Sequence, residues 1–174
     1  PIYNYLITRL NSKFINNAHD EFNPIKYRKK IEKNILNPSN PTISAVIIVL
    51  FNKNQETYSI LIKRSTYNGL HSGQIALPGG KFEKFDQNIK NTAIRELNEE
   101  LGIHISENQI IGYLNSLYIP ISNFEVFPYV AFIEEPKITM NSYEVENYII
   151  YPISDLLKPE SIIDIELKLN DEVI

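Results

Sequence analysis

The chain has 174 residues, of which 43% are hydrophobic and 22% charged, which is the composition of one globular domain and not of a disordered protein. Its net charge of −4 argues against nucleic acid as a bulk ligand, and the lack of cysteine excludes disulfides and thiol catalysis. No apolar run is long enough to cross a membrane and no signal-like segment opens the sequence, so we expect a cytoplasmic protein without a membrane partner.

The N-terminal part reads as a helix followed by a linker. Apolar residues recur at helical spacing over residues 2–14, which predicts an amphipathic helix. Residues 15–41 are polar and punctuated by prolines, which indicates a linker with room for one short helix. We therefore divide the chain into this part, residues 1–41, and a main domain over residues 42–174.

The main domain alternates between strand and helix patterns. A continuous β-branched run over residues 42–51 predicts a buried strand, residues 52–55 a turn, and the alternating residues 58–63 its partner strand. A helix that ends at Gly102 follows. The next predicted elements are three strands and a short helix, at residues 110–119, 126–133, 144–151 and 152–157. This order predicts an α/β fold, a mixed β-sheet between helices in an α/β/α sandwich.

The helix before Gly102 carries an acidic cluster, Glu96, Glu99 and Glu100. At about 100° per residue, Glu96 and Glu100 differ by about 40°, and Glu99 lies about 60° to the other side of Glu96. The three carboxylates therefore share one strip of surface, where like charges repel. A solvated acidic face is the common reading of such a cluster. The alternative is a site for a hard divalent cation such as Mg²⁺, which would remove the repulsion.

The flanks of this helix favour the metal site over the solvated face. Apolar residues form a stripe that adjoins the acidic cluster, so Glu100 lies at the border of the buried face. Gly102 suits the C-terminal end of the helix, and Gly79-Gly80 permit a tight turn with positive φ before it.

Residues 80–103 resemble the signature of the Nudix hydrolases. A glycine is followed six positions later by an acid, and then by Arg-Glu-hydrophobic-x-Glu-Glu-x-Gly-hydrophobic. The matching residues are Gly80, Asp86, Arg95, Glu96, Leu97, Glu99, Glu100, Gly102 and Ile103. Asp86 stands where Glu is commoner, and eight residues separate it from Arg95 in place of seven. Because Asp86 precedes the helix, we expect it to be the N-cap.

The segment before the signature resembles the Nudix subgroup that cleaves coenzyme A. An Arg-Ser run, a His-x-Gly-Gln element and a Pro-Gly-Gly turn precede the expanded signature in that subgroup. The resemblance implies that substrate-binding residues lie in these elements and beside the glycines. In this chain they are Arg64, His71, Gly73, Gln74, Gly79, Gly80 and Lys81.

The acidic cluster and its arginine supply the catalytic residues that we expect. Glu96 and Glu100 form the i, i+4 metal-ligand pair, and Glu99 is either a third ligand or the base that deprotonates water. We expect Arg95 to point away from the acidic strip, and the resemblance implies that it ion-pairs to hold the carboxylates. Some Nudix enzymes take the base from a later loop instead, for which Glu125, Glu134, Glu135 and Glu144 are candidates.

The resemblance implies a hydrolase that needs Mg²⁺ or Mn²⁺ and acts on a nucleotide diphosphate. The favoured substrate is coenzyme A or acyl-CoA, cut to 3′,5′-ADP and 4′-phosphopantetheine. The alternatives are a nucleoside-diphosphate-X hydrolase acting on ADP-ribose or a dinucleotide, and a non-catalytic regulator that binds a nucleotide. The resemblance also implies a C-terminal helix against the sheet, for which residues 158–174 show no helical pattern. Either the sequence is truncated or partly ordered there, or a partner covers that face of the sheet, for which we consider a homodimer.

Overall fold

The computed structural model of the protein describes residues 2–10, 40–66, 71–119, 122–156, 158–161, 168–169 and 172–173. Its helices are α1 (Ile2–Leu10), α4 (Ile89–Leu101) and α5 (Ile153–Leu156), with 3₁₀ turns η1 (Lys84–Asp86), η2 (Glu107–Gln109) and η3 (Pro159–Ser161). Its strands are β1 (Thr42–Lys53), β2 (Glu56–Arg64), β3 (Ile75–Ala76), β4 (Gly79–Lys81), β5 (Ile110–Tyr113), β6 (Leu117–Ile119), β7 (Phe124–Ile133), β8 (Val145–Pro152), β9 (Lys168–Leu169) and β10 (Glu172–Val173).

The centre of the fold is the long pair of strands β1 and β7. They run parallel over ten aligned positions, from Thr42 opposite Phe124 to Phe51 opposite Ile133. All other pairings among the described strands are antiparallel. In the main sheet β2 joins β1 through a tight hairpin, β8 and β3 join β2, β4 joins β1, and β5 and β6 join β7, and β9 and β10 pair with each other apart from it. The predicted mixed sheet is therefore confirmed.

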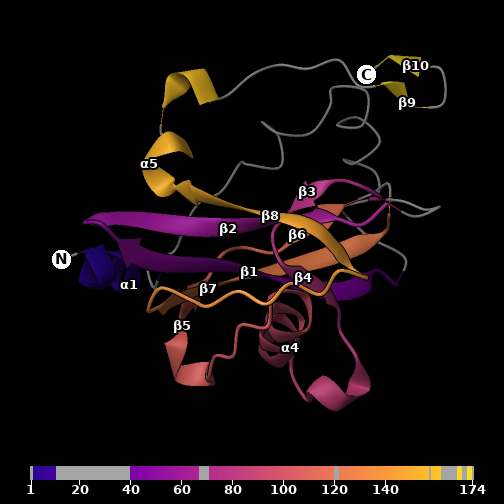
Figure 1. The fold of residues 1–174 in the computed structure, drawn as a ribbon. Coiled ribbons are helices and arrows are strands. Elements are labelled where there is room, and N and C mark those ends of the chain that lie inside the picture. Colours follow the sequence, from indigo (N-terminus) through magenta and orange to yellow (C-terminus); the bar gives the residue numbers. More distant parts are fainter. Residues whose placement is uncertain are drawn as a thin grey trace.

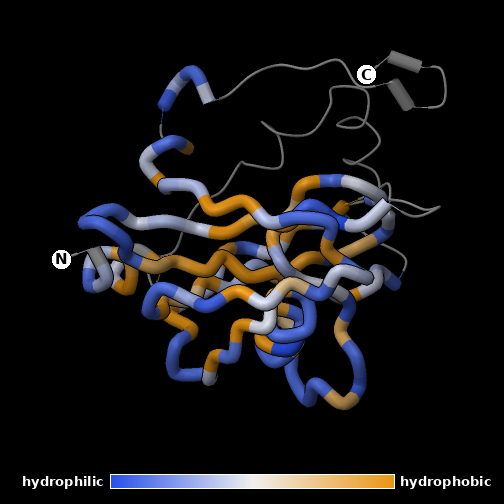
Figure 2. Tube along the Cα trace, in the orientation of Figure 1, coloured by the Kyte–Doolittle hydropathy of each residue, from blue (hydrophilic) through white to orange (hydrophobic). Residues whose placement is uncertain are grey.

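Helices pack on both faces of this sheet, as Figure 1 shows for α4 below the strands and α1 beside them. Successive side chains of a strand point to opposite faces, so β1 serves two apolar clusters. Its residues Ala45, Ile47, Val49 and Phe51 pack with α4, and Ile48 and Leu50 pack with α1. Figure 2 shows the apolar colouring concentrated along β1 and its neighbours. The predicted α/β/α sandwich is confirmed.

The α4 helix is held in the core by one apolar stripe. Ala93, Leu97 and Leu101 are fully buried against β1. Truncation of a buried leucine such as Leu97 to alanine typically costs about 2–5 kcal/mol, so this stripe fixes where the acidic face of the helix lies. Gly102 ends the helix as predicted, with φ of 64° and its N–H donated to the Asn98 carbonyl.

The expected N-cap of this helix was wrong. Asn88, and not Asp86, caps α4, because the Asn88 side chain accepts a hydrogen bond from the Asn91 N–H. Asp86 ends η1, two residues earlier, where it is buried. The glycine turn was also wrong: Gly79 has the expected positive φ, 155°, but Gly79–Lys81 form strand β4 beside β1 and not a turn that leads into the helix.

The single strand predicted at residues 110–119 is two strands in the structure. β5 pairs with the end of β7 near Tyr129 and β6 with its beginning near Val126, and Leu114 to Ser116 lie between them. Pro128 stands at this point of β7. Proline has no N–H to donate, so the ladder is interrupted opposite it.

The remaining predicted elements agree with the structure where it describes them. The N-terminal helix is seen from Ile2 to Leu10, and the hairpin strands and the later strands lie within two residues of the expected bounds. The linker over residues 15–41 lies almost wholly outside the described residues, as do residues 11–14 and 157. Within the part of the chain that the structure describes, every helix is too short or too polar to span a bilayer.

Candidate active site

Two glycines of β4 let the carboxylates of α4 approach the sheet. The Gly79 N–H donates to Oε2 of Glu100 at 2.9 Å. A Cβ on Gly79 would lie 2.3 Å from the Ala45 carbonyl oxygen, and one on Gly80 would lie 2.2 Å from Oε1 of Glu96. Main-chain atoms therefore require glycine at position 79, whereas at position 80 glycine leaves room for the Glu96 carboxylate. Glu96 and Glu100 flank the same short strand.

Arg95 joins three carboxylates on the outer side of α4. Its Nη1 donates to Oε1 of Glu96 at 2.8 Å and to Oε2 of Glu99 at 2.7 Å, and its Nε donates to Oδ1 of Asp86 at 2.7 Å. Arg95 thus does not point away from the acidic strip, as we had expected, but bridges two of its members. The carboxylates around it raise the pKa of the Arg95 guanidinium, with the Asp86 hydrogen bond as the largest cause.

Asp86 anchors this arginine from the interior. Burial alone would raise the pKa of Asp86, but hydrogen bonds from Arg95, the Glu83 N–H and the Thr92 hydroxyl together outweigh it and hold the pKa below its ordinary value. The carboxylate therefore stays charged although the residue is only 5% exposed. Its place in the sequence signature is explained by the contact with Arg95 and not by capping of α4.

A cavity of about 770 Å³ opens beside the two glycines. Of the expected site residues, Arg64, His71, Gln74, Gly79, Gly80, Lys81, Glu96 and Glu100 line it, whereas Gly73, Arg95 and Glu99 do not. The Glu99 side chain is 47% exposed and paired with Arg95. The remaining walls come from residues that the sequence did not single out as binding residues: Ser44, Val46, Ser65, Ala76, Leu77, Ile119, Ser122, Phe124, Val126, Tyr143 and Glu144.

At Glu96 and Glu100, the positive charge nearby does not fully compensate the two largely buried carboxylates. Burial raises the pKa of Glu100 to about 8, because the Gly79 N–H and the Arg64 guanidinium, 3.6 Å away, only partly compensate and nearby carboxylates oppose ionisation. Burial also raises the pKa of Glu96, although Arg95 counteracts it. Paired carboxylates that are desolvated in this way suit a bound cation.

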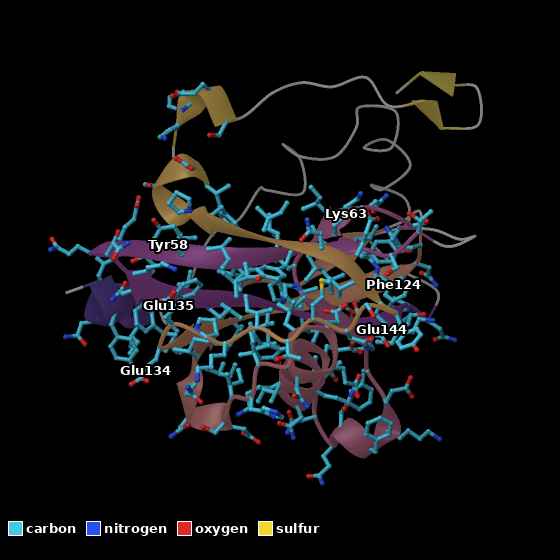
Figure 3. The ribbon with its side chains drawn as sticks, in the orientation of Figure 1. Tyr58, Lys63, Phe124, Glu134, Glu135 and Glu144 are labelled. Atoms are coloured by element: carbon cyan, nitrogen blue, oxygen red, sulfur yellow. The ribbon has the colours of Figure 1, made fainter. Side chains whose placement is uncertain are left out.

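Glu144 is the one candidate of the four later glutamates that lines this cavity. It adds to the negative potential at both Glu96 and Glu100. Figure 3 shows Glu144 near Phe124 at one end of the sheet, with Glu134 and Glu135 at the other end. Glu135 instead pairs with Lys53 at 2.6 Å, and Glu125 accepts a hydrogen bond from Ser116 at 3.1 Å.

The position of Glu144 follows from long-range strand pairing. Arg64 at the end of β2 lies opposite Val145 at the start of β8, and the Ser65 N–H donates to the Glu144 carbonyl at 2.9 Å. This pairing places Glu144 beside Arg64 and Ser65, the Arg-Ser run of the sequence. The local sequence named Glu144 only as one of four candidates, so the β2–β8 register was needed to single it out.

Glu96 and Glu100 fit a divalent cation by their chemistry. They are adjacent, largely withdrawn from solvent and carry oxygen ligands of the type that Mg²⁺ prefers. Among the described residues, no three histidine, aspartate or glutamate side chains already converge as a formed metal site. Glu99 is held outside the cavity by Arg95, which accounts for the missing third member of the expected set.

Residues 41–168 match the family profile described as NUDIX domain. The chain belongs to the Nudix family. Among relatives, the human protein named mitochondrial coenzyme A diphosphatase NUDT8 is 29% identical over 71% of this chain and 53% of its own length. Nudix hydrolase 22, chloroplastic, of Arabidopsis thaliana is 34% identical over 70% of this chain and 41% of its own length. The chain spans about half the length of the curated relatives it matches.

Solved Nudix structures share the fold. A MutT/nudix family protein from Enterococcus faecalis superposes with a TM-score of 0.58 at 19% identity, covering 80% of this chain and 57% of that one. The NUDIX domain of Shewanella oneidensis NrtR, solved with ADP ribose, gives a TM-score of 0.57 at 18% identity and covers 72% of this chain and 85% of that one. These likenesses establish the fold of the Nudix family for this chain.

Proposed function

We propose that the protein is a Mg²⁺-dependent Nudix pyrophosphohydrolase that cleaves the diphosphate of coenzyme A or acyl-CoA. The observation that carries the proposal is the pair Glu96 and Glu100, which flank the glycine strand β4 and line one cavity with Arg64. In the reaction, water adds to one phosphorus and the bridging P–O bond breaks. The products are 3′,5′-ADP and 4′-phosphopantetheine.

Glu96 and Glu100 are the residues that would hold the metal, and the expected third ligand Glu99 could join them only after its ion pair with Arg95 breaks. When bound, Mg²⁺ or Mn²⁺ would neutralise the diphosphate and activate water. Arg95 acts as a positioning residue, because its hydrogen bonds to Glu96 and Asp86 fix where the Glu96 carboxylate lies. The base is either Glu99 or Glu144. Because Glu144 lines the cavity, its carboxylate can reach a water molecule bound there.

The choice of coenzyme A is supported by the walls of the cavity. Arg64, Ser65, His71 and Gln74, the elements that resemble the coenzyme A subgroup, all line it. Nδ1 of His71 lies 3.0 Å from the side-chain oxygen of Gln74, so the two residues support one another. A relative named as a coenzyme A diphosphatase points to the same substrate. The cytoplasmic location and the homodimer stay predictions.

A turnover screen with and without metal tests the proposal. Coenzyme A, ADP-ribose, a dinucleoside polyphosphate and NADH are offered at equal concentration with Mg²⁺, with Mn²⁺ and with excess EDTA. We expect the highest kcat/KM for coenzyme A and almost no product in EDTA. A kcat/KM for ADP-ribose or the dinucleotide ten times that of coenzyme A would overturn the substrate and favour the nucleoside-diphosphate-X alternative. Binding without turnover of any substrate would favour the regulator.

A further inference from the structure

The floor of the cavity is a patch of sheet that presents one cation beside apolar side chains. Lys81, Ser44 and Val126 occupy one row across β4, β1 and β7, so their side chains point to the same face. Phe124 lies two residues before Val126 and opposite Ile119 of β6, and it faces the same side. This arrangement is independent of the glutamates of α4, which reach the cavity past Gly79 and Gly80.

Lys81 differs from the other cationic groups of the cavity. The Arg64 guanidinium lies 3.6 Å from Glu100, and His71 is in contact with Gln74. The Lys81 ammonium has no carboxylate within ion-pair distance among the described residues and lies 5.7 Å from the centroid of the Phe124 ring. Its main chain is fixed, because its carbonyl accepts a hydrogen bond from Nη2 of Arg95 at 2.9 Å. The side chain is exposed and can meet a ligand.

A second polar group lacks a partner on the same side of the cavity. The hydroxyl of Ser122 is buried and has no hydrogen-bond partner in the described part of the chain. Ser122 lines the cavity two residues from Phe124. A buried hydroxyl without a partner is costly, and a ligand with a polar edge would satisfy it.

We propose that Lys81 and Phe124 form the subsite for a phosphorylated nucleoside, with the base over the Phe124 ring and a phosphate monoester on its ribose at the Lys81 ammonium. Aromatic rings bind nucleobases by stacking, and an ammonium group without a carboxylate partner attracts a phosphate dianion. The polar edge of the base reaches the Ser122 hydroxyl. Under the proposed function, on which this inference rests, the group bound here is the 3′-phosphoadenosine of coenzyme A.

The position of this subsite agrees with the position of the glutamates. Lys81 directly follows Gly80, whose Cα abuts the Glu96 carboxylate. A diphosphate at Glu96 and Glu100 therefore has its nucleoside close to Lys81 and Phe124. With this subsite, the cavity should bind a nucleotide whose ribose carries an additional phosphate more tightly than one whose ribose does not.

The test compares two ligands that differ by that phosphate. Adenosine 3′,5′-bisphosphate and AMP are titrated calorimetrically into the wild type, Lys81→Gln, Phe124→Leu and the matched control Lys84→Gln, an exposed lysine outside the cavity. We expect Lys81→Gln to weaken the bisphosphate about tenfold or more and AMP less than about twofold. Phe124→Leu should weaken both about tenfold, and Lys84→Gln neither.

The outcomes separate this inference from the proposed function. Equal affinity of the wild type for the two ligands, no binding of either at millimolar concentration, or equal weakening of both by Lys81→Gln would overturn the subsite. Kinetics with coenzyme A and 3′-dephospho-coenzyme A complete the test: KM for coenzyme A alone should rise in Lys81→Gln. If coenzyme A is not hydrolysed but Lys81→Gln selectively weakens the bisphosphate, the proposed substrate fails and the subsite stands.

Discussion

The Asp86 carboxylate and the Arg95 guanidinium are joined by two hydrogen bonds, at 2.7 Å from Nε and 3.2 Å from Nη2, across nine residues of sequence. Nη1 of the same guanidinium donates to Glu96 and Glu99. A buried aspartate thus sets the position of an arginine, and the arginine sets the positions of two members of the acidic cluster.

Replacement of Asp86 by alanine should destabilise the fold and lower activity together. It leaves Nε of Arg95 and the Thr92 hydroxyl without an acceptor, which typically costs about 3 kcal/mol in the free energy of unfolding. Urea denaturation measures this cost. Glu107→Gln is the control, since it removes the more exposed ion pair with Lys90 and should cost less than about 1 kcal/mol. Equal costs for the two variants would contradict the anchoring role of Asp86.

The neighbouring glycines of β4 should respond differently to alanine. In Gly79→Ala the new Cβ meets main-chain atoms of Ala45 and Val46 at a φ of 155°, so we expect a loss of about 2 kcal/mol or more in stability. In Gly80→Ala it meets only the end of the Glu96 side chain, which can move. We expect Gly80→Ala to fold but to lose about 100-fold in kcat/KM, because the carboxylate is displaced. Thermal denaturation and turnover of the same samples distinguish the two, and a fully active Gly80→Ala would be inconsistent with the site.

Glu100→Gln should lower activity sharply without harming the fold. We expect kcat to fall on the order of 10²–10⁴, since a metal-binding charge is lost. The metal-free protein should keep its Tm or gain a little, because the variant removes a carboxylate whose ionisation is disfavoured by burial. Turnover assays with a metal titration measure the loss of kcat, and thermal denaturation followed by circular dichroism measures Tm. Turnover in excess EDTA equal to that with Mg²⁺ would refute the metal site itself.

The stability of the metal-free protein should fall as pH rises from about 4.5 to about 8. Burial raises the pKa of Glu100 from its ordinary value of 4.5 to about 8, so in this range the folded protein holds a proton that the unfolded chain releases. Stability therefore decreases with pH across this window. Mg²⁺ should stabilise the protein more at pH 8 than at pH 6, because it competes with that proton. Tm measured against pH should show a shallower decline in Glu100→Gln, and identical curves would exclude Glu100 as the titrating group.

Glu144 and Glu99 are distinguished as bases by their glutamine variants. Loss of a general base typically costs about 10²–10⁴ in rate and flattens the rising limb of the pH–rate profile. Glu144 lines the cavity and Glu99 does not, so we expect Glu144→Gln to show this behaviour and Glu99→Gln to show a smaller loss through Arg95. Glu134→Gln, at the far end of the sheet, serves as the control. A flattened profile in Glu99→Gln alone would restore Glu99 as the base.

The sequence predicted correctly those strands and helices whose residue patterns are local. The buried strand β1, its hairpin partner, the acidic helix and its end at Gly102 are all encoded in contiguous residues. The N-cap was misassigned because Asp86 precedes the helix and is of the right residue type. Only the tertiary contact with Arg95 shows that its carboxylate is directed inward.

The parts that were missed depend on pairing between distant segments. The break between β5 and β6 follows from Pro128 on the neighbouring strand, which the pattern of residues 110–119 does not contain. The importance of Glu144 follows from the register of β8 against β2. Phe124 lay outside the strand predicted at residues 126–133, and its role is seen only when β1 and β7 are aligned beside Lys81.

The parallel alignment of β1 with β7 also bears on how the protein acquires its shape. Thr42 and Phe124 are neighbours in the sheet, so a loop of roughly eighty residues must close before this contact forms. Such non-local pairing is slow to form compared with a hairpin or a helix. The acidic helix and β4 come from one contiguous stretch and can form early, but the floor beneath Lys81 is assembled only when β7 arrives. During synthesis, the ability to hold a ligand would therefore appear late, once the chain beyond residue 133 has emerged.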